Sequence, residues 1–183
     1  MMAFFSYPAR GAGALGLALC LALPVAAQVQ TNPLGVVDAM IGGVAYHGET
    51  LDVPSEGTAT AEFRAFGPVH SITIQAHDPE AESITRNVLV VDISLMGNDA
   101  SAPAVDVSVS YWPEGMRSAF YVSDEGGEGA EVVFDVLSLG DDAAASGSFT
   151  ALLCRKESMF AEADLDTCLP VEGTFDTALR PGE

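Results

Sequence analysis

The sequence predicts an all-β protein, an antiparallel β-sandwich or barrel of about eight to nine short strands. Three observations lead to this prediction. Several segments alternate apolar and polar residues, turns rich in Gly, Pro and Asp recur at short intervals, and helical periodicity is scarce. Short strands joined by such turns favour an antiparallel sandwich or barrel over an α/β fold.

The expected strands follow one another along the chain after a flexible lead-in at 28–33. The first candidate, Ala39–Tyr46, is interrupted by a Gly-Gly pair, and the second, Gly57–Phe66, alternates as a half-buried strand does. Asn87–Met96 is the strongest apolar stretch and is expected at the centre of a sheet. The other expected strands are 71–76, 105–111, 119–123, 131–139, 147–154 and 169–179.

Residues 1–27 are expected to be a signal peptide. Arg10 precedes an uncharged run, Gly11–Val25, and cleavage is expected after Ala27. A retained membrane anchor is the less favoured interpretation, since the run is short for a span of about 20 residues. A lipid-modified Cys20 is also disfavoured, because bulky Leu19 precedes it.

The charge balance narrows the range of partners. The chain of 183 residues has 7 Lys+Arg and 26 Asp+Glu, a net charge of −19, with 49% hydrophobic residues. Loss of Arg10 with the signal peptide leaves −20 on 28–183, expected to be a single domain. Nucleic acid and anionic membranes would repel such a charge and are not expected as partners, and the apolar content excludes disorder. We expect no cofactor and no membrane span in the mature chain.

The cysteines of the mature part, Cys154 and Cys168, are expected to form a disulfide. An exported chain meets oxidising conditions, where an even pair of cysteines is typically bridged. Zinc is disfavoured because the three histidines lie far upstream and no C-x-x-C occurs. The loop between the cysteines holds the one helical candidate of note, Glu157–Asp164.

A strand motif occurs twice near the C-terminus, in Gly147–Leu153 and Gly173–Leu179. Each copy reads Gly, hydroxyl residue, Phe, and then Leu four positions after the Phe. In a β-strand this spacing puts the Phe and the Leu on one face, which we expect to be the core face.

The repeated motif also predicts a register. If the two cysteines pair across antiparallel strands, Phe149 lies opposite Gly173 and Phe175 lies opposite Gly147. Each ring would then cover the glycine of the other strand. The cysteines would lie on the face opposite the two phenylalanines.

With these two G-[ST]-F-x-x-x-L strands and the earlier Ala39–Tyr46, the chain resembles small uncharacterised secreted bacterial β-sandwich proteins. The chain departs from their pattern at Met40–Gly42 and in its cysteine pair. The resemblance implies a sandwich fold and export, and no catalytic residues.

Two acidic segments are candidates for Ca²⁺ binding, although no metal site is the expected outcome. Asp124, Glu125 and Glu128 lie in a glycine-rich turn that is dense in oxygen ligands but lacks EF-hand spacing, and a solvated hairpin turn is the favoured interpretation. Asp164 and Asp166 permit the same suggestion.

Hydrolase chemistry has little support in the sequence. No G-x-S-x-G motif occurs, and acids surround His47, His70 and His77 as they surround most of the chain. No catalytic residue is therefore assigned.

Tyr111 and Trp112 form a candidate binding patch. The favoured interpretation is that Trp112, at a strand end before Pro113, covers the open end of the sandwich. If it is instead exposed beside Tyr111 and Met116, these side chains would bind sugar rings or a partner protein.

The sequence thus favours an exported, non-catalytic β-sandwich protein, a binding or structural module of the cell envelope, periplasmic or extracellular. An envelope protein or a glycan is the expected partner, and the oligomeric state stays open. The alternatives are a small secreted hydrolase whose site assembles only in space, and a Ca²⁺-dependent adhesin-like module.

Overall fold

The computed structural model of the protein describes residues 30–123 and 129–182. Within these ranges all the regular secondary structure consists of β-strands. The all-β fold is as predicted, and no helix occurs in these two ranges, not even at the helical candidate Glu157–Asp164. The strands are β1 (Asn32–Ile41), β2 (Val44–Val53), β3 (Thr58–Ala59), β4 (Ala61–Phe66), β5 (Val69–His77), β6 (Val88–Leu95), β7 (Ala104–Trp112), β8 (Phe120–Val122), β9 (Glu131–Ser138), β10 (Ala144–Lys156), β11 (Asp164–Ala178) and β12 (Arg180–Pro181).

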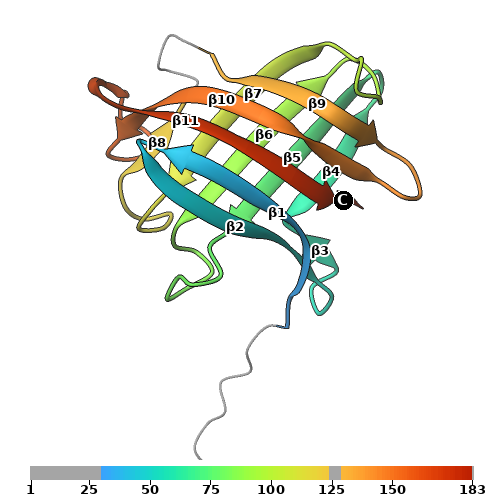
Figure 1. Cartoon of the computed structure of the whole chain (residues 1–183), viewed down its shortest axis with the longest axis horizontal. Coiled ribbons are helices and arrows are strands. Elements are labelled where there is room, and N and C mark those ends of the chain that lie inside the picture. Colours follow the sequence, from blue (N-terminus) through green and yellow to red (C-terminus); the bar gives the residue numbers. More distant parts are fainter. Residues whose placement is uncertain (1–29, 124–128, 183) are drawn as a thin grey trace, which may run out of the picture.

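The strands are hydrogen-bonded in one path, β12-β4-β5-β6-β7-β8-β10-β11-β1-β2-β3, and β9 pairs with β10 beside this path. All pairings are antiparallel except that of β12 with β4. The path folds over into two layers: β9, β10, β11, β1 and β2 lie in front in Figure 1, and β4 to β7 cross behind them. Glu49 of β2 pairs with His77 of β5, so the layers also meet along this side.

The core lies between the two layers and consists of the alternating inward residues of both. In the rear layer Ile72, Ile74, Val91 and Ile93 are almost fully buried, and Phe149 is the largest fully buried side chain of the front layer. Burial of such aliphatic and aromatic side chains is the main favourable contribution to folding. The core-facing side of the strands is therefore mainly apolar. Thr50 and Thr177 are buried there as well and are hydrogen-bonded to each other.

The predicted register at the C-terminus is confirmed. β10 and β11 pair with Cys154 opposite Cys168, and the two cysteines form a disulfide. Phe149 lies opposite Gly173, where a Cβ would lie only 2.6 Å from the ring carbon Cζ of Phe149, so that ring covers the glycine. Phe149 and Phe175, with the leucines four positions after them, lie in the core.

For Gly147 the predicted register is confirmed, but the predicted cover of this glycine by the ring of Phe175 is wrong. Gly147 lies opposite Phe175, but the nearest atoms to a Cβ there belong to the backbone of β9, with the carbonyl oxygen of Val133 at 2.2 Å. The register of β9 against β10 shifts at this glycine. Gly147 therefore allows the close approach of β9, which the repeated motif alone does not specify.

Two further expectations are corrected in the first hairpin and in the disulfide loop. Gly42 and Gly43, both with positive φ, are the two-residue turn between β1 and β2, and β1 already begins at Asn32 in the expected flexible lead-in. Glu157–Asp164 forms turns and the start of β11 instead of a helix. The cross-strand disulfide brings the ends of this loop together, which suits a hairpin.

The expected signal peptide, its Cys20 and the acidic turn at Asp124, Glu125 and Glu128 lie outside the described residues. In the part of the chain that the structure does describe, no helix is long and apolar enough to cross a membrane.

Candidate functional site

An apolar pocket of about 260 Å³ lies on the outer side of the rear layer, beside Trp112. Three neighbouring strands, β5, β6 and β7, form its floor, and the loops after β5 and β7 form its walls. We call it the Trp112 pocket; its lining residues are Gln75, His77, Ile84, Thr85, Val88, Val90, Trp112 and Met116.

The floor of the pocket is set by the register of the three strands. Val88 of β6 pairs with His77 of β5 on one side and with Trp112 of β7 on the other. Val90, two residues further along β6, pairs with Gln75 of β5. Because successive side chains alternate between faces, Val88 and Val90 point away from the core in which Leu89 and Val91 are buried. Apolar residues on both sides of β6 need a cover on both sides, and the two loops provide it on the outer side.

Trp112 is held in place by two neighbours. Its ring stacks on Phe120 of β8, with centroids 4.1 Å apart and ring planes 6° from parallel. Its indole Nε1 donates a hydrogen bond to Oγ of Ser110 at 3.0 Å. The side chain is half-buried, so the indole is a fixed wall of the pocket.

His77 joins the floor to the loop above it. Its Nδ1 lies 2.6 Å from the carbonyl oxygen of Ile84, which can only accept, so Nδ1 carries the proton. Nε2 then accepts from the side-chain amide of Gln75 at 3.1 Å. Burial lowers the pKa of His77 below its usual value, partly offset by the hydrogen bond to Ile84. His77 is thus neutral at pH 7, with both nitrogens in structural hydrogen bonds.

Asn87 fixes the other end of the same loop. It has a positive φ of 53°, its side chain donates to Asp78, and its backbone N–H donates to the carbonyl of Pro113. The hydroxyl of Tyr111 donates to Oδ1 of Asn87 at 2.5 Å. These hydrogen bonds tie the loop after β5 to the end of β7, next to Trp112.

Tyr111 and Trp112, the predicted binding patch, lie on opposite sides of β7. Tyr111 packs against the core, edge-to-face with Tyr46 at 6.2 Å, whereas Trp112 faces the outer pocket together with Met116. The structure thus brings Trp112 and Met116 together and places Tyr111 on the inner side, where burial raises the pKa of its hydroxyl.

The buried state of His77 predicts a pH dependence of stability. Because its folded pKa is depressed, the unfolded chain binds the proton more tightly, so the free energy of unfolding falls as pH drops below about 6.5. Urea unfolding at several pH values between about 5 and 7.5 measures the slope. The variant His77→Gln is expected to lose this fall of the free energy of unfolding at low pH. His47→Gln is the control, since the pKa of His47 is raised by its hydrogen bond to Asp38 and contributes with the opposite sign. A slope unchanged in His77→Gln would contradict the assignment.

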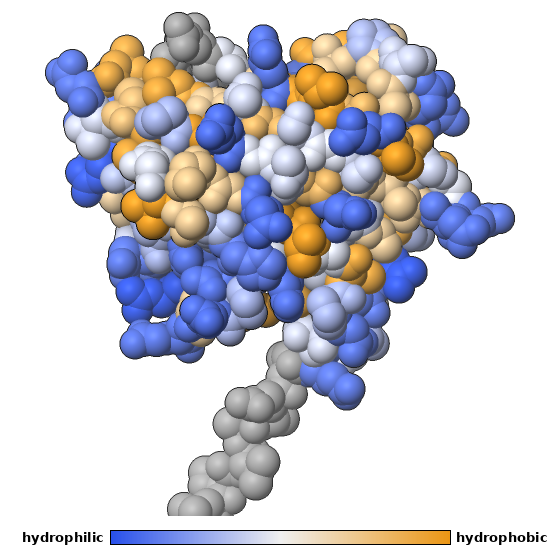
Figure 2. All heavy atoms as spheres, viewed as in Figure 1, coloured by the Kyte–Doolittle hydropathy of each residue, from blue (hydrophilic) through white to orange (hydrophobic). Residues whose placement is uncertain are grey.

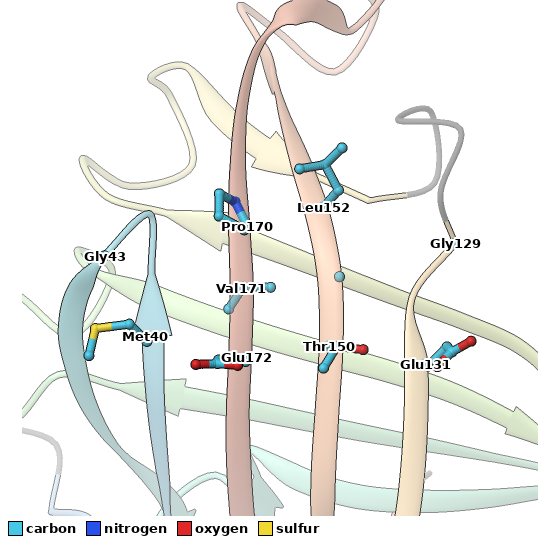
Figure 3. Close-up of a pocket in the computed structure, with 10 residues that line it drawn as sticks. Met40, Gly43, Gly129, Glu131, Thr150, Leu152, Pro170, Val171 and Glu172 are labelled. Atoms are coloured by element: carbon cyan, nitrogen blue, oxygen red, sulfur yellow. The ribbon is translucent and has the colours of Figure 1, made fainter.

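A larger hollow of about 760 Å³ lies on the outer side of the front layer (Figure 3). It is open to solvent, and its floor is a row of outward side chains across β9, β10, β11 and β1: Glu131, Thr150, Glu172 and Met40. Pro170 and Leu152 lie beside this row. Two carboxylates border the hollow, so it favours cationic or hydroxyl-bearing groups over the purely apolar groups that suit the Trp112 pocket.

The three histidines lie in separate parts of the fold. His47 is exposed and hydrogen-bonded to Asp38 at 2.7 Å. His70 lies on the inner side of β5, where this strand pairs with β4, and His77 lies in the Trp112 pocket. In the row Thr174, Asp38, His47 the acid stands between the hydroxyl and the imidazole. A nucleophile–base–acid relay needs the imidazole in the middle. This row therefore lacks the order that the hydrolase alternative requires.

The candidate cation ligands divide into two groups. Asp124, Glu125 and Glu128 are outside the described ranges, as noted above. The carboxylate of Asp164 accepts hydrogen bonds from the hydroxyl of Thr167 and from the backbone N–H of Asp166, which lower its pKa. Among the described residues no cluster of three or more His, Cys, Asp or Glu could hold a metal ion.

No protein family, curated protein or solved structure matches this chain.

The sequence predicted Trp112 and Met116 as parts of one binding patch, but it did not predict the other residues that line the pocket. The available signal was the apolar run Val88–Val91 at the start of β6, since an antiparallel strand with one wet face would show polar residues at positions 88 and 90. Gln75 and Ile84 carried no comparable signal, because only strand pairing and the loop path bring them to Trp112.

Proposed function

We propose that the protein is an exported, non-catalytic binding or structural module of the cell envelope, and that it binds an apolar group in the Trp112 pocket. The observation that carries this proposal is the pocket itself, a recess lined mainly by Ile84, Val88, Val90, Trp112 and Met116. Concave sites with apolar walls are the usual places where proteins hold small ligands or partner side chains.

The polar groups of the pocket support binding rather than chemistry. His77, the group most suited to acid–base catalysis, is neutral and uses both nitrogens in hydrogen bonds to Gln75 and Ile84. A glycan would bring hydroxyl groups against hydrocarbon walls, where they lose hydrogen bonds to water without replacement. An aromatic or aliphatic group, such as a partner's side chain, is the better match.

A fluorescence titration tests this proposal, because Trp112 is the single tryptophan of the protein. We expect benzyl alcohol, a small aromatic probe, to change the emission of Trp112 saturably at protein concentrations of about 1 μM. Met116→Asp puts a charge at the pocket wall and is expected to abolish the saturable change, since a charge opposes entry of an apolar probe.

Met96→Asp is the matched control, since Met96 is also exposed but directly follows the far end of β6, away from the pocket. It is expected to bind the probe as the unmodified protein does. A change that never saturates, or that is the same in Met116→Asp, would reject the pocket as a binding site.

A further inference from the structure

The hairpin between β10 and β11 carries exposed apolar side chains at its tip. Met159 is 64% exposed and Phe160 is fully exposed, at 101%. They occupy the two central positions of a turn closed by a hydrogen bond from the N–H of Ala161 to the carbonyl of Ser158. Apolar surface (orange in Figure 2) shows at the upper left, where this hairpin projects in Figure 1. We call Met159 and Phe160 the apolar tip.

The base of the hairpin is braced. The Cys154–Cys168 disulfide joins its two strands, and the carboxylate of Asp164 organises the next turn through the backbone of Asp166 and the hydroxyl of Thr167. The apolar tip is therefore displayed on a fixed support. Exposed apolar groups in such an arrangement are typical of protein interaction surfaces.

The apolar tip and the Trp112 pocket lie at the same end of the molecule. Lys156, the last residue of β10 before the tip, pairs with Phe120, and Phe120 stacks on Trp112. The turn of the first hairpin lies at this end too, since Tyr46 contacts Tyr111. One end of the sandwich thus offers both an exposed phenyl group and an apolar recess.

We propose that this end pairs with the same end of a second copy of the chain, with Phe160 of each copy inserted into the Trp112 pocket of the other. The inference rests on the proposed function, because it names the group that the pocket binds. A pocket of about 260 Å³ with hydrocarbon walls accommodates a phenyl ring. Because tip and pocket share one end, two reciprocal contacts form around a two-fold axis, and the assembly closes as a dimer.

Local charge favours the same pairing. Glu162 follows the apolar tip, and Arg117 follows Met116 at the pocket wall. Arg117 is exposed, and the described part of the chain gives it no ion pair. In the dimer the acidic hairpin of one copy faces this arginine of the other.

The large net negative charge opposes association overall, so we expect the dimer to be tighter in about 0.5 M salt than in about 0.1 M salt.

Sedimentation equilibrium of the purified protein, processed as the expressing cell leaves it, tests the dimer. We expect a monomer–dimer equilibrium at concentrations up to about 1 mM. Phe160→Asp removes both phenyl contacts at once and is expected to raise the dimer dissociation constant by about 100-fold or more, since each contact is worth about tenfold. Phe66→Asp is the matched control, because Phe66 is also exposed but lies at the opposite end, and it should leave dimerisation unchanged.

Mixing two variants tests the reciprocal contact. Phe160→Asp keeps the pocket intact and Met116→Asp keeps the phenyl group intact, so a dimer of either variant alone lacks both contacts, whereas a mixed dimer retains one complete contact. We expect the mixture to associate more tightly than either variant alone and more weakly than the unmodified protein. Unchanged melting temperatures would show that both variants are folded.

Three results would overturn the dimer: a protein that stays monomeric at about 1 mM in both salts, Phe160→Asp that dimerises normally, or a mixture no tighter than its components. If the benzyl alcohol titration still saturates, the pocket remains a binding site and only its occupant is wrong. If that titration also fails, the proposed function fails with it.

Discussion

Replacing Phe149 with alanine is expected to lower the free energy of unfolding by about 3–5 kcal/mol, the usual cost of removing a buried aromatic side chain. Phe149 is 1% exposed and packs against Phe175 with ring centroids 6.5 Å apart. It also covers Gly173 on the paired strand, so its loss exposes a strand position that has no side chain of its own. Urea unfolding followed by circular dichroism measures the change.

Phe66→Ala is the control for this prediction, because it removes the same side chain from an exposed hairpin. It is expected to change the free energy of unfolding by less than about 0.5 kcal/mol, as surface substitutions usually do. Phe149→Leu keeps most of the volume and should be intermediate between Phe149→Ala and the unmodified protein. Equal losses in Phe149→Ala and Phe66→Ala would contradict the assigned packing.

The C-terminal hairpin could be predicted in register because its sequence contains several constraints that agree. A cysteine pair requires direct opposition of two strands, and the two Gly-x-Phe motifs then align without further assumption. Period-two alternation likewise located β4 and β7, within Gly57–Phe66 and 105–111, since one buried face imposes it. Such patterns do not show which strand lies along the other edge of β10. The contact of β9 with Gly147 was therefore not predicted.

The first hairpin shows how one local signal permits two structures. A Gly-Gly pair inside an apolar stretch is compatible with an interrupted strand or with a two-residue turn. The contacts of the surrounding strands decide which of the two structures forms. Here Met40 pairs with Ala45 across the turn, and β1 continues along β11. The decisive contacts, those of β1 with β11, are long-range, which is why residues 28–33 were expected to be a flexible lead-in.

The candidate site was less predictable than the fold for a related reason. Its lining comes from three strands and two loops, and it forms only when β5, β6 and β7 are aligned with His77, Val88 and Trp112 in one row. Nothing local specifies that alignment. A single tryptophan before a Pro-Glu-Gly turn indicates a position of interest, and only the tertiary structure shows which side of the strand it faces.

Loss of the disulfide is expected to lower the free energy of unfolding by about 3 kcal/mol, because the cross-link restricts a short loop in the unfolded chain. The two cysteines are separated by 14 positions and join directly paired strands. The variant in which both are alanine tests this by urea unfolding. The unmodified protein in reductant is the matched control, since it breaks the same bond without removing the buried sulfur of Cys154.

The comparison between variant and reductant separates two causes of the loss. If chain entropy dominates, both lower the free energy of unfolding by similar amounts, whereas a packing effect at Cys154 makes the alanine variant clearly worse. Because the bond braces the hairpin that carries Phe160, its reduction should also weaken dimerisation, by allowing the apolar tip to take other orientations. Full stability in reductant would mean that strand pairing alone holds the hairpin. Dimerisation unchanged by reduction would show that the apolar tip needs no brace.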